Sequence, residues 1–161
     1  MRDTAIGQLE SSHRRHEDRL ELLIAAAEQL GGGHGGPADL EDLEDAVTWF
    51  ARSVPMHFGD EDEVVFPALA AARPDLTEAL AGFTAEHPAL LAAHAGVRDT
   101  LVAWAGREPP AADLVAFDAA VRDLAARYRD HAAREDVIFA TLDLTLDDAA
   151  LLAALGARRG R

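Results

Sequence analysis

The chain contains no cysteine and no lysine among its 161 residues. The absence of cysteine excludes disulfides, iron–sulfur clusters, thiolate-bound zinc and catalytic thiols. Aromatic residues make up only 6% of the chain, and no apolar run approaches the roughly 20 residues that a membrane-spanning helix needs. The first residues also lack the apolar segment of a secretory signal. We therefore expect a cytoplasmic protein with no membrane partner.

The charge is strongly acidic, with 29 acidic residues against 15 basic residues and a formal net charge of −14. A chain of this charge repels the phosphate backbone, so we expect no nucleic-acid partner. The basic end, Arg158-Arg159-Gly160-Arg161, is interpreted as a solvated terminus or a partner of a helix dipole. The alanine-rich, lysine-free composition indicates a GC-rich bacterial genome, and the sequence leaves the oligomeric state open.

Helical periodicity dominates the chain, and no alternation typical of strands occurs. A hydrophobic content of 49% over this length predicts a single domain, residues 1–161. Apolar stripes separated by glycine and proline predict helices over about residues 9–30, 39–71, 75–104 and 111–142, with a short C-terminal helix near 147–155. Pro55 is expected to kink or divide the second helix, and Pro88 to kink the third or delay its start. The fold class is therefore all-α, an up-down-up-down four-helix bundle.

The two halves of the chain repeat each other. His57 follows His13 by 44 residues, and His131 follows His87 by the same 44 residues. A glutamate stands four residues after the second histidine of each half, so the halves are offset by 74 residues. The chain is thus interpreted as two copies of a helix pair.

The repeated histidines and glutamates predict a metal site. A histidine and a glutamate four residues apart on a helix point the same way, so the two halves together present four imidazoles and two carboxylates: His13, His57, Glu61, His87, His131 and Glu135. A single such pair is ordinarily a surface ion pair, but both pairs here lie on apolar stripes, where an unpaired charge is costly. The nitrogen and oxygen donors favour iron or manganese. Two carboxylates can bridge two ions, which predicts a dinuclear site inside the bundle.

The same pattern resembles the hemerythrin-like (HHE cation-binding) family over about residues 11–155. It reads His13 … His57-x-x-x-Glu61 … Glu86-His87 … His131-x-x-x-Glu135, with Phe66-Pro67 after the first carboxylate. The resemblance implies a four-helix bundle of the bacterial type around two non-haem iron ions, with manganese or zinc as less usual occupants. It also implies that the six residues named above are the metal ligands, and that the small-molecule partner is dioxygen, peroxide or nitric oxide.

One departure from the family bears on function. Oxygen-carrying members have a second histidine four residues after the first on the third helix, whereas residue 91 here is leucine. A more open site favours redox chemistry, so we expect a di-iron oxidase, a peroxidase or a nitric-oxide-handling enzyme. The alternatives are an iron- or oxygen-responsive sensor without turnover, a reversible oxygen carrier, and a structural bundle whose site is vestigial or holds zinc.

Two further histidines are open assignments. His16 follows His13 by three residues on the same stripe and is an alternative or additional ligand. His94 lies two helical turns beyond His87, roughly 10 Å away along the helix axis. It is interpreted as a core histidine, as an acid or base beside the site, or as a ligand. His34, in the glycine-rich linker, is expected to be solvated.

Other polar residues near the motifs also have two interpretations. Tyr128, one turn before His131, either packs in the core or directs its hydroxyl at the metal pocket, and with His94 it is a candidate catalytic residue. Asp60, Asp62 and Glu63 flank a ligand and are interpreted as a solvated face. Their alternative role is to load metal or to support the ligands.

Overall fold

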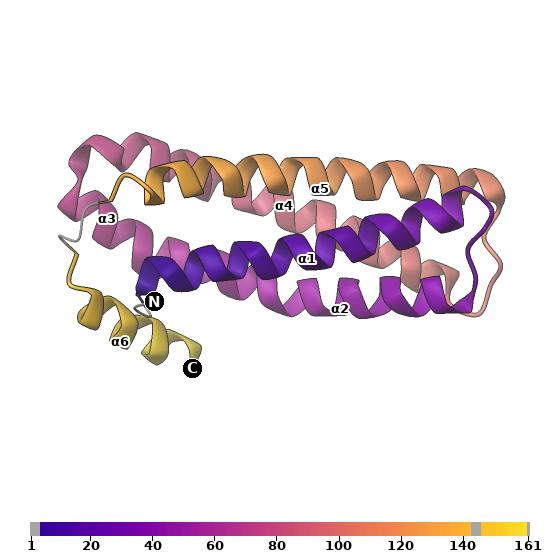
Figure 1. Cartoon of the computed structure of the whole chain (residues 1–161), viewed down its shortest axis with the longest axis horizontal. Coiled ribbons are helices and arrows are strands. Elements are labelled where there is room, and N and C mark those ends of the chain that lie inside the picture. Colours follow the sequence, from indigo (N-terminus) through magenta and orange to yellow (C-terminus); the bar gives the residue numbers. More distant parts are fainter. Residues whose placement is uncertain (1–3, 143–145, 161) are drawn as a thin grey trace.

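The computed structural model describes residues 4–142 and 146–160, and these residues form helices joined by short turns (Figure 1). The long helices are α1 (Ala5–Gly31), α2 (Pro37–Asp60), α4 (Thr77–Trp104) and α5 (Ala111–Phe139). A π-helical segment, η1 (Glu61–Val65), joins α2 to α3 (Phe66–Ala72), and a 3₁₀ turn, η2 (Pro74–Leu76), leads into α4. The short helix α6 (Asp148–Arg159) comes last. The prediction of an all-α chain is confirmed.

The four long helices lie side by side and alternate in direction (Figure 1). Helix α1 packs against α2 and α5, and α4 packs against the same two helices. Each long helix therefore has its chain neighbours beside it, as an up-down-up-down bundle requires. No helix in the described part of the chain is both long and apolar enough to cross a membrane.

Local residue choices define where the helices begin and end. The Thr4 side chain accepts a hydrogen bond of 3.0 Å from the backbone N–H of Gly7 and so caps the start of α1. Gly33, in the linker after α1, has φ of 74°, and Gly106, between α4 and α5, has φ of 70°. Glycine adopts such left-handed conformations without steric cost, so it suits both turns.

The predicted effects of the internal prolines are partly wrong. Helix α2 continues through Pro55 to Asp60, and α4 begins at Thr77, well before Pro88. The backbone departs from α-geometry later, in η1, where the N–H of Phe66 bonds to the carbonyl of Glu61, five residues back. Pro67 follows directly, and its ring lacks an N–H and crowds the carbonyl four residues before it, which accounts for the widened turn.

Helix α6 is attached to the bundle by ion pairs that the sequence did not predict. Asp60 is only 2% exposed, and it accepts hydrogen bonds from Arg158 Nη1 at 3.0 Å and from Arg159 Nε at 2.8 Å. Asp60 is therefore not part of a solvated face. The two arginines lie in the last turn of α6, as the helix-dipole interpretation expects, and they pair with Asp60 as well. A Cβ at Gly59 would come within 1.6 Å of Arg158 Nη2, so a side chain there would displace the Arg158 guanidinium from its present position.

We predict that Asp60→Ala loosens α6. The substitution leaves two guanidinium groups without their shared partner, and the free energy of unfolding should fall by about 1–3 kcal/mol. Hydrogen exchange of the α6 amides should become faster at the same time. Asp75→Ala is the matched control, because it breaks an arginine–aspartate pair that is exposed on the surface. Equal effects of the two substitutions would show that the contacts of Asp60 do not hold α6.

Candidate metal centre

The structure brings six predicted residues together in the interior of the bundle. His13 comes from α1, His57 from α2 and His87 from α4. Glu61 is the first residue of η1, and α5 contributes the remaining pair, His131 and Glu135. Both glutamates are fully buried, and the most exposed of the six residues, His13, is only 6% exposed.

These residues form two overlapping groups, each able to hold a metal ion. One group consists of His13, His57, Glu61 and Glu135, and the other of Glu61, His87, His131 and Glu135. Within each group the candidate ligand atoms all lie within 4.8 Å of one another. The two groups therefore contain different histidines and share both carboxylates.

Glu61 presents one carboxylate oxygen to each group. Its Oε1 atom lies 3.0 Å from Nε2 of His57, and its Oε2 atom lies 3.4 Å from Nε2 of His87. The η1 backbone places this side chain at the end of α2, where its two oxygens span the gap between α2 and α4.

Glu135 has the same relation to the other two histidines. Its Oε2 atom lies 3.3 Å from Nε2 of His13, and its Oε1 atom lies 3.0 Å from Nε2 of His131. The two glutamates thus occupy equivalent positions, as the repeat in the sequence suggested. Each carboxylate therefore directs one oxygen toward each of the two groups.

The inward-facing atoms of these residues fit a metal. Among the described residues, the Nε2 atoms of all four histidines and all four carboxylate oxygens are buried without a hydrogen-bond partner. Buried polar atoms are nearly always satisfied, because leaving one unpaired costs about 1–3 kcal/mol. A set of imidazole nitrogens and carboxylate oxygens with free lone pairs is the donor set that first-row transition metals accept.

The outer ring nitrogens are held by a second set of carboxylates. Nδ1 of His13 lies 2.7 Å from Asp136 Oδ1, and Nδ1 of His87 lies 3.0 Å from Asp62 Oδ2. Nδ1 of His131 lies 2.8 Å from Glu86 Oε2. Such a contact places the proton on Nδ1 and leaves Nε2 free for a metal. His57 is the exception, because its Nδ1 atom has no hydrogen-bond partner among the described residues.

Two of these supporting carboxylates carried a signal in the sequence. Asp62 and Asp136 each directly follow the glutamate of a His-x-x-x-Glu unit, so they repeat with the same offset as the ligands. The interpretation of Asp62 as a solvated residue is wrong, since it bonds to His87 and accepts from the Thr84 hydroxyl at 2.6 Å. Sequence reasoning missed this contact because it forms between helices, whereas periodicity describes only one helix at a time.

The electrostatics of the site favour protonated histidines when no metal is bound. Burial lowers the pKa of His13, but the carboxylates of Asp136, Glu135 and Glu61 outweigh this effect and raise that pKa to about 11. Burial also raises the pKa of Glu135, but its ion pairs with His13 and His131 outweigh this effect and hold that pKa well below its usual value. In the absence of metal, the six grouped residues therefore include imidazolium–carboxylate ion pairs.

His16 lies beside this site, outside both groups. Its Nδ1 atom shares a hydrogen bond with the Tyr128 hydroxyl, and its Nε2 atom lies 2.9 Å from Ser53 Oγ. Burial and the neighbouring histidines lower the pKa of His16 to about 2, so its ring is neutral. Burial and the charges of Glu61 and Glu135 raise the pKa of Tyr128 well above its usual value. Both ring nitrogens of His16 thus have hydrogen-bond partners among the described residues, unlike the Nε2 atoms of the four grouped histidines.

His94 and His34 also lie away from the two groups. The ring of His94 packs 4.8 Å from that of Phe50, and its Nε2 atom has no hydrogen-bond partner among the described residues. Burial lowers the pKa of His94 to about 4, so this ring too is neutral at pH 7. His34 is exposed in the linker between α1 and α2.

We predict that metal loading at pH 7 releases at least one proton per chain. The raised pKa of His13 keeps that ring protonated in the metal-free protein, and a metal binds only the neutral imidazole. As the pH falls, protons compete more strongly for the site, so the apparent metal affinity should decrease. Calorimetric titrations in buffers of different ionisation enthalpy measure the release directly. A binding enthalpy independent of the buffer would contradict the prediction.

The comparisons with known proteins agree with this geometry. A family model described as the Hemerythrin HHE cation binding domain matches residues 4–142. Among curated proteins and among solved structures, none matches the chain significantly. The matched residues include both candidate metal groups, whereas α6 lies beyond them. The chain belongs to the hemerythrin HHE cation-binding domain family.

Proposed function

We propose that this protein is a non-haem di-iron protein that binds and reduces dioxygen, peroxide or nitric oxide. The observation that carries the proposal is the sharing of both carboxylates, Glu61 and Glu135, by two groups that each contain two different histidines. This arrangement is suited to a pair of bridged ions, because each carboxylate directs one oxygen to each group.

The donor set supports iron over other metals. Each ion would have two imidazole nitrogens and two carboxylate oxygens, without any thiolate. Iron accepts further ligands beyond these four, whereas structural zinc is usually closed by four donors. Ferrous ions bound in this way would supply the electrons for reduction of the small ligand.

Aromatic side chains surround the histidines and limit the access of water. The Phe58 ring stacks on His87 with centroids 3.9 Å apart, and the Phe83 ring lies 5.6 Å from that of His131. The ring of Phe139, from the second half of the chain, stacks on that of His13, from the first half, with centroids 6.2 Å apart. A dry apolar wall strengthens the electrostatic interactions inside the site and protects a reactive ligand from side reactions.

Tyr128 supports reduction over reversible carriage. Its hydroxyl is buried and protonated, and it lies close enough to Glu61 and Glu135 for their charges to raise its pKa. It therefore holds a proton beside the candidate metal groups. His16 and Ser53 continue the hydrogen-bonded chain from this hydroxyl toward the surface. A proton donor at this position is what reduction of dioxygen or peroxide needs.

Removal of either shared carboxylate tests the proposal. We expect the unaltered protein to bind about two iron ions per chain after anaerobic ferrous reconstitution, since two groups are present. Glu61→Ala and Glu135→Ala should each abolish the dinuclear loading, as measured by metal content. His34→Ala should load normally, because His34 lies on the surface linker. Equal iron content in all three variants would refute the site.

Tyr128→Phe separates proton supply from metal binding. The substitution keeps the ring and removes the hydroxyl, so iron content should be unchanged and turnover of dioxygen or peroxide should fall about 100-fold. His94→Gln is the companion variant, and we expect little effect on turnover because His94 lies outside both groups. Unchanged turnover in Tyr128→Phe would rule out this hydroxyl as the proton donor.

A metal-responsive module without turnover is the second candidate. Asp60, which holds α6, directly precedes Glu61 in the chain. A change in the position of Glu61 on metal binding would therefore reach α6 through one peptide bond. A large gain in stability on iron loading, without consumption of dioxygen, peroxide or nitric oxide, would favour this candidate.

A further inference from the structure

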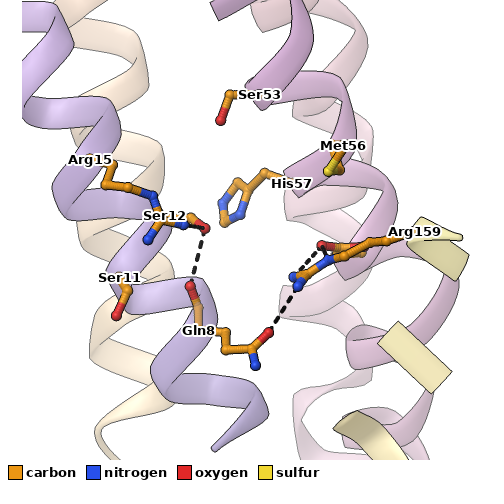
Figure 2. Close-up of a pocket in the computed structure, with 9 residues that line it drawn as sticks. Gln8, Ser11, Ser12, Arg15, Ser53, Met56, His57 and Arg159 are labelled. Carbon is orange, nitrogen blue, oxygen red and sulfur yellow. Dashed lines mark hydrogen bonds and ion pairs between the residues drawn. The ribbon is translucent and has the colours of Figure 1, made fainter. Parts of the chain in front are cut away.

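A polar cavity of about 430 Å³ lies between α1, α2 and α6, beside the candidate metal groups, and His57 is the one residue of those groups among its lining residues. Figure 2 shows the imidazole of His57 between α1 and α2, with Ser12 and Ser53 on either side of it. Two arginines also line the cavity, Arg15 from α1 and Arg159 from α6. The cavity thus joins one of the candidate metal ligands to a surface rich in hydrogen-bond donors.

The His57 ring lacks an outer acceptor. The inference rests on the proposed function, because a metal on Nε2 of His57 requires the proton to be on Nδ1. The other three ligand histidines each contact a carboxylate through Nδ1, whereas Nδ1 of His57 is buried and has no partner in the described part of the chain. Buried donors are normally satisfied, so an acceptor from outside the chain is expected here.

The internal repeat identifies the chemical class of that acceptor. An offset of 74 residues relates His131 to His57, and it relates Glu86 to Ser12. In the second half, Glu86 supplies the carboxylate that contacts Nδ1 of His131 at 2.8 Å. In the first half, Ser12 stands at the equivalent position and lines the cavity beside His57. A carboxylate is therefore missing where the second half of the chain has one.

The cavity carries the cations that such a carboxylate needs. Arg134 holds Glu86 through two hydrogen bonds of 3.0 and 2.7 Å. At the cavity, Arg15 bonds to the Ser12 hydroxyl at 2.9 Å, and Arg159 lies on the other side, where it contacts Asp60. Asp60 lines the cavity too and is shared with Arg158, which also pairs with Glu63. Arg159 donates a further hydrogen bond of 2.9 Å to Gln8 Oε1. The lining therefore contains two guanidinium groups and one carboxylate, whereas the whole chain carries a net charge of −14.

We propose that this cavity binds a small carboxylate anion that accepts a hydrogen bond from Nδ1 of His57 and is held by Arg15 and Arg159. The anion occupies the position that Glu86 has relative to His131. It orients the His57 ring and makes the geometry of one metal group dependent on a molecule in solution. Arg159 belongs to α6, beyond the residues that match the family model, so the cavity is completed by a segment outside the matched domain.

Acetate is the probe, and zinc-loaded protein is the sample, because zinc gives no paramagnetic broadening in NMR spectra. Acetate replaces chloride at constant ionic strength, and metal content is measured on the same sample. We expect saturable shifts of the His57 Nδ1–H resonance and of the Nε–H resonances of Arg15 and Arg159. Acetamide, which has the same shape without the charge, should produce none of these shifts.

Variants of the cavity provide the decisive comparison. Ser12→Glu restores a carboxylate in the chain, so it should shift the His57 resonance without acetate and abolish acetate binding. Arg15→Gln should weaken acetate binding about tenfold, since it removes a charged hydrogen bond. Arg14→Gln is the matched control, because it removes the same charge from a neighbouring residue that does not line the cavity.

The outcomes distinguish this inference from the proposed function. Absence of saturable acetate shifts in metal-loaded protein would overturn the inference, with water then filling the cavity, and so would equal weakening by Arg15→Gln and Arg14→Gln. Failure to load any metal would contradict the proposed function instead. In that case the Arg15 and Arg159 resonances of the same sample still report acetate binding. Absence of any acetate-dependent shift in them would overturn the inference as well.

Discussion

The structure depends on two carboxylates that are buried at its centre without hydrogen-bond partners. Glu61 and Glu135 are both fully inaccessible to solvent, and a buried unpaired carboxylate is among the most costly groups in a protein. Four histidines from four helices converge on these two side chains and compensate their charge, either as protonated rings or as partners around a metal. The four long helices therefore surround one charged centre.

Around this centre, each helix supports residues of another helix. Asp136 from α5 contacts His13 of α1, Asp62 from η1 contacts His87 of α4, and Glu86 from α4 contacts His131 of α5. These bonds orient the ring nitrogens before any metal arrives, so little reorganisation is needed on binding. The one histidine without such support, His57, faces the cavity that α6 completes. The Nδ1–carboxylate contacts thus follow the internal repeat for three of the histidines, and His57 is the exception among the described residues.

The proposed chemistry draws on the same asymmetry between the halves. Tyr128 and His16 are buried neighbours in contact with each other, and both are held neutral by burial and by the surrounding charges. Ser53 continues this hydrogen-bonded chain and lines the same cavity as His57. The cavity between α1 and α2 is therefore lined both by the proposed metal ligand His57 and by Ser53, the outer end of the hydrogen-bonded chain from Tyr128. A site built on the other side of the bundle would lack this connection, because Glu86 and Arg134 fill the equivalent position there.

Helical periodicity and the repeated His-x-x-x-Glu unit predicted the all-α bundle, and they predicted which six residues would meet, because both signals are local or follow a constant offset. The ligand roles of these residues stay a prediction.

Contacts between helices could not be predicted from periodicity and spacing along the chain. Periodicity does not show that the Tyr128 hydroxyl bonds to His16, that Asp62 supports a histidine of α4, or that Arg158 and Arg159 reach back to Asp60. The backbone change in η1 was missed for a related reason, since a proline shows where a hydrogen bond is lost but not how neighbouring turns absorb the loss. Composition and spacing along the chain thus defined the helices and their inward faces, whereas the partners of each polar group were decided by packing, which brings together residues far apart in sequence.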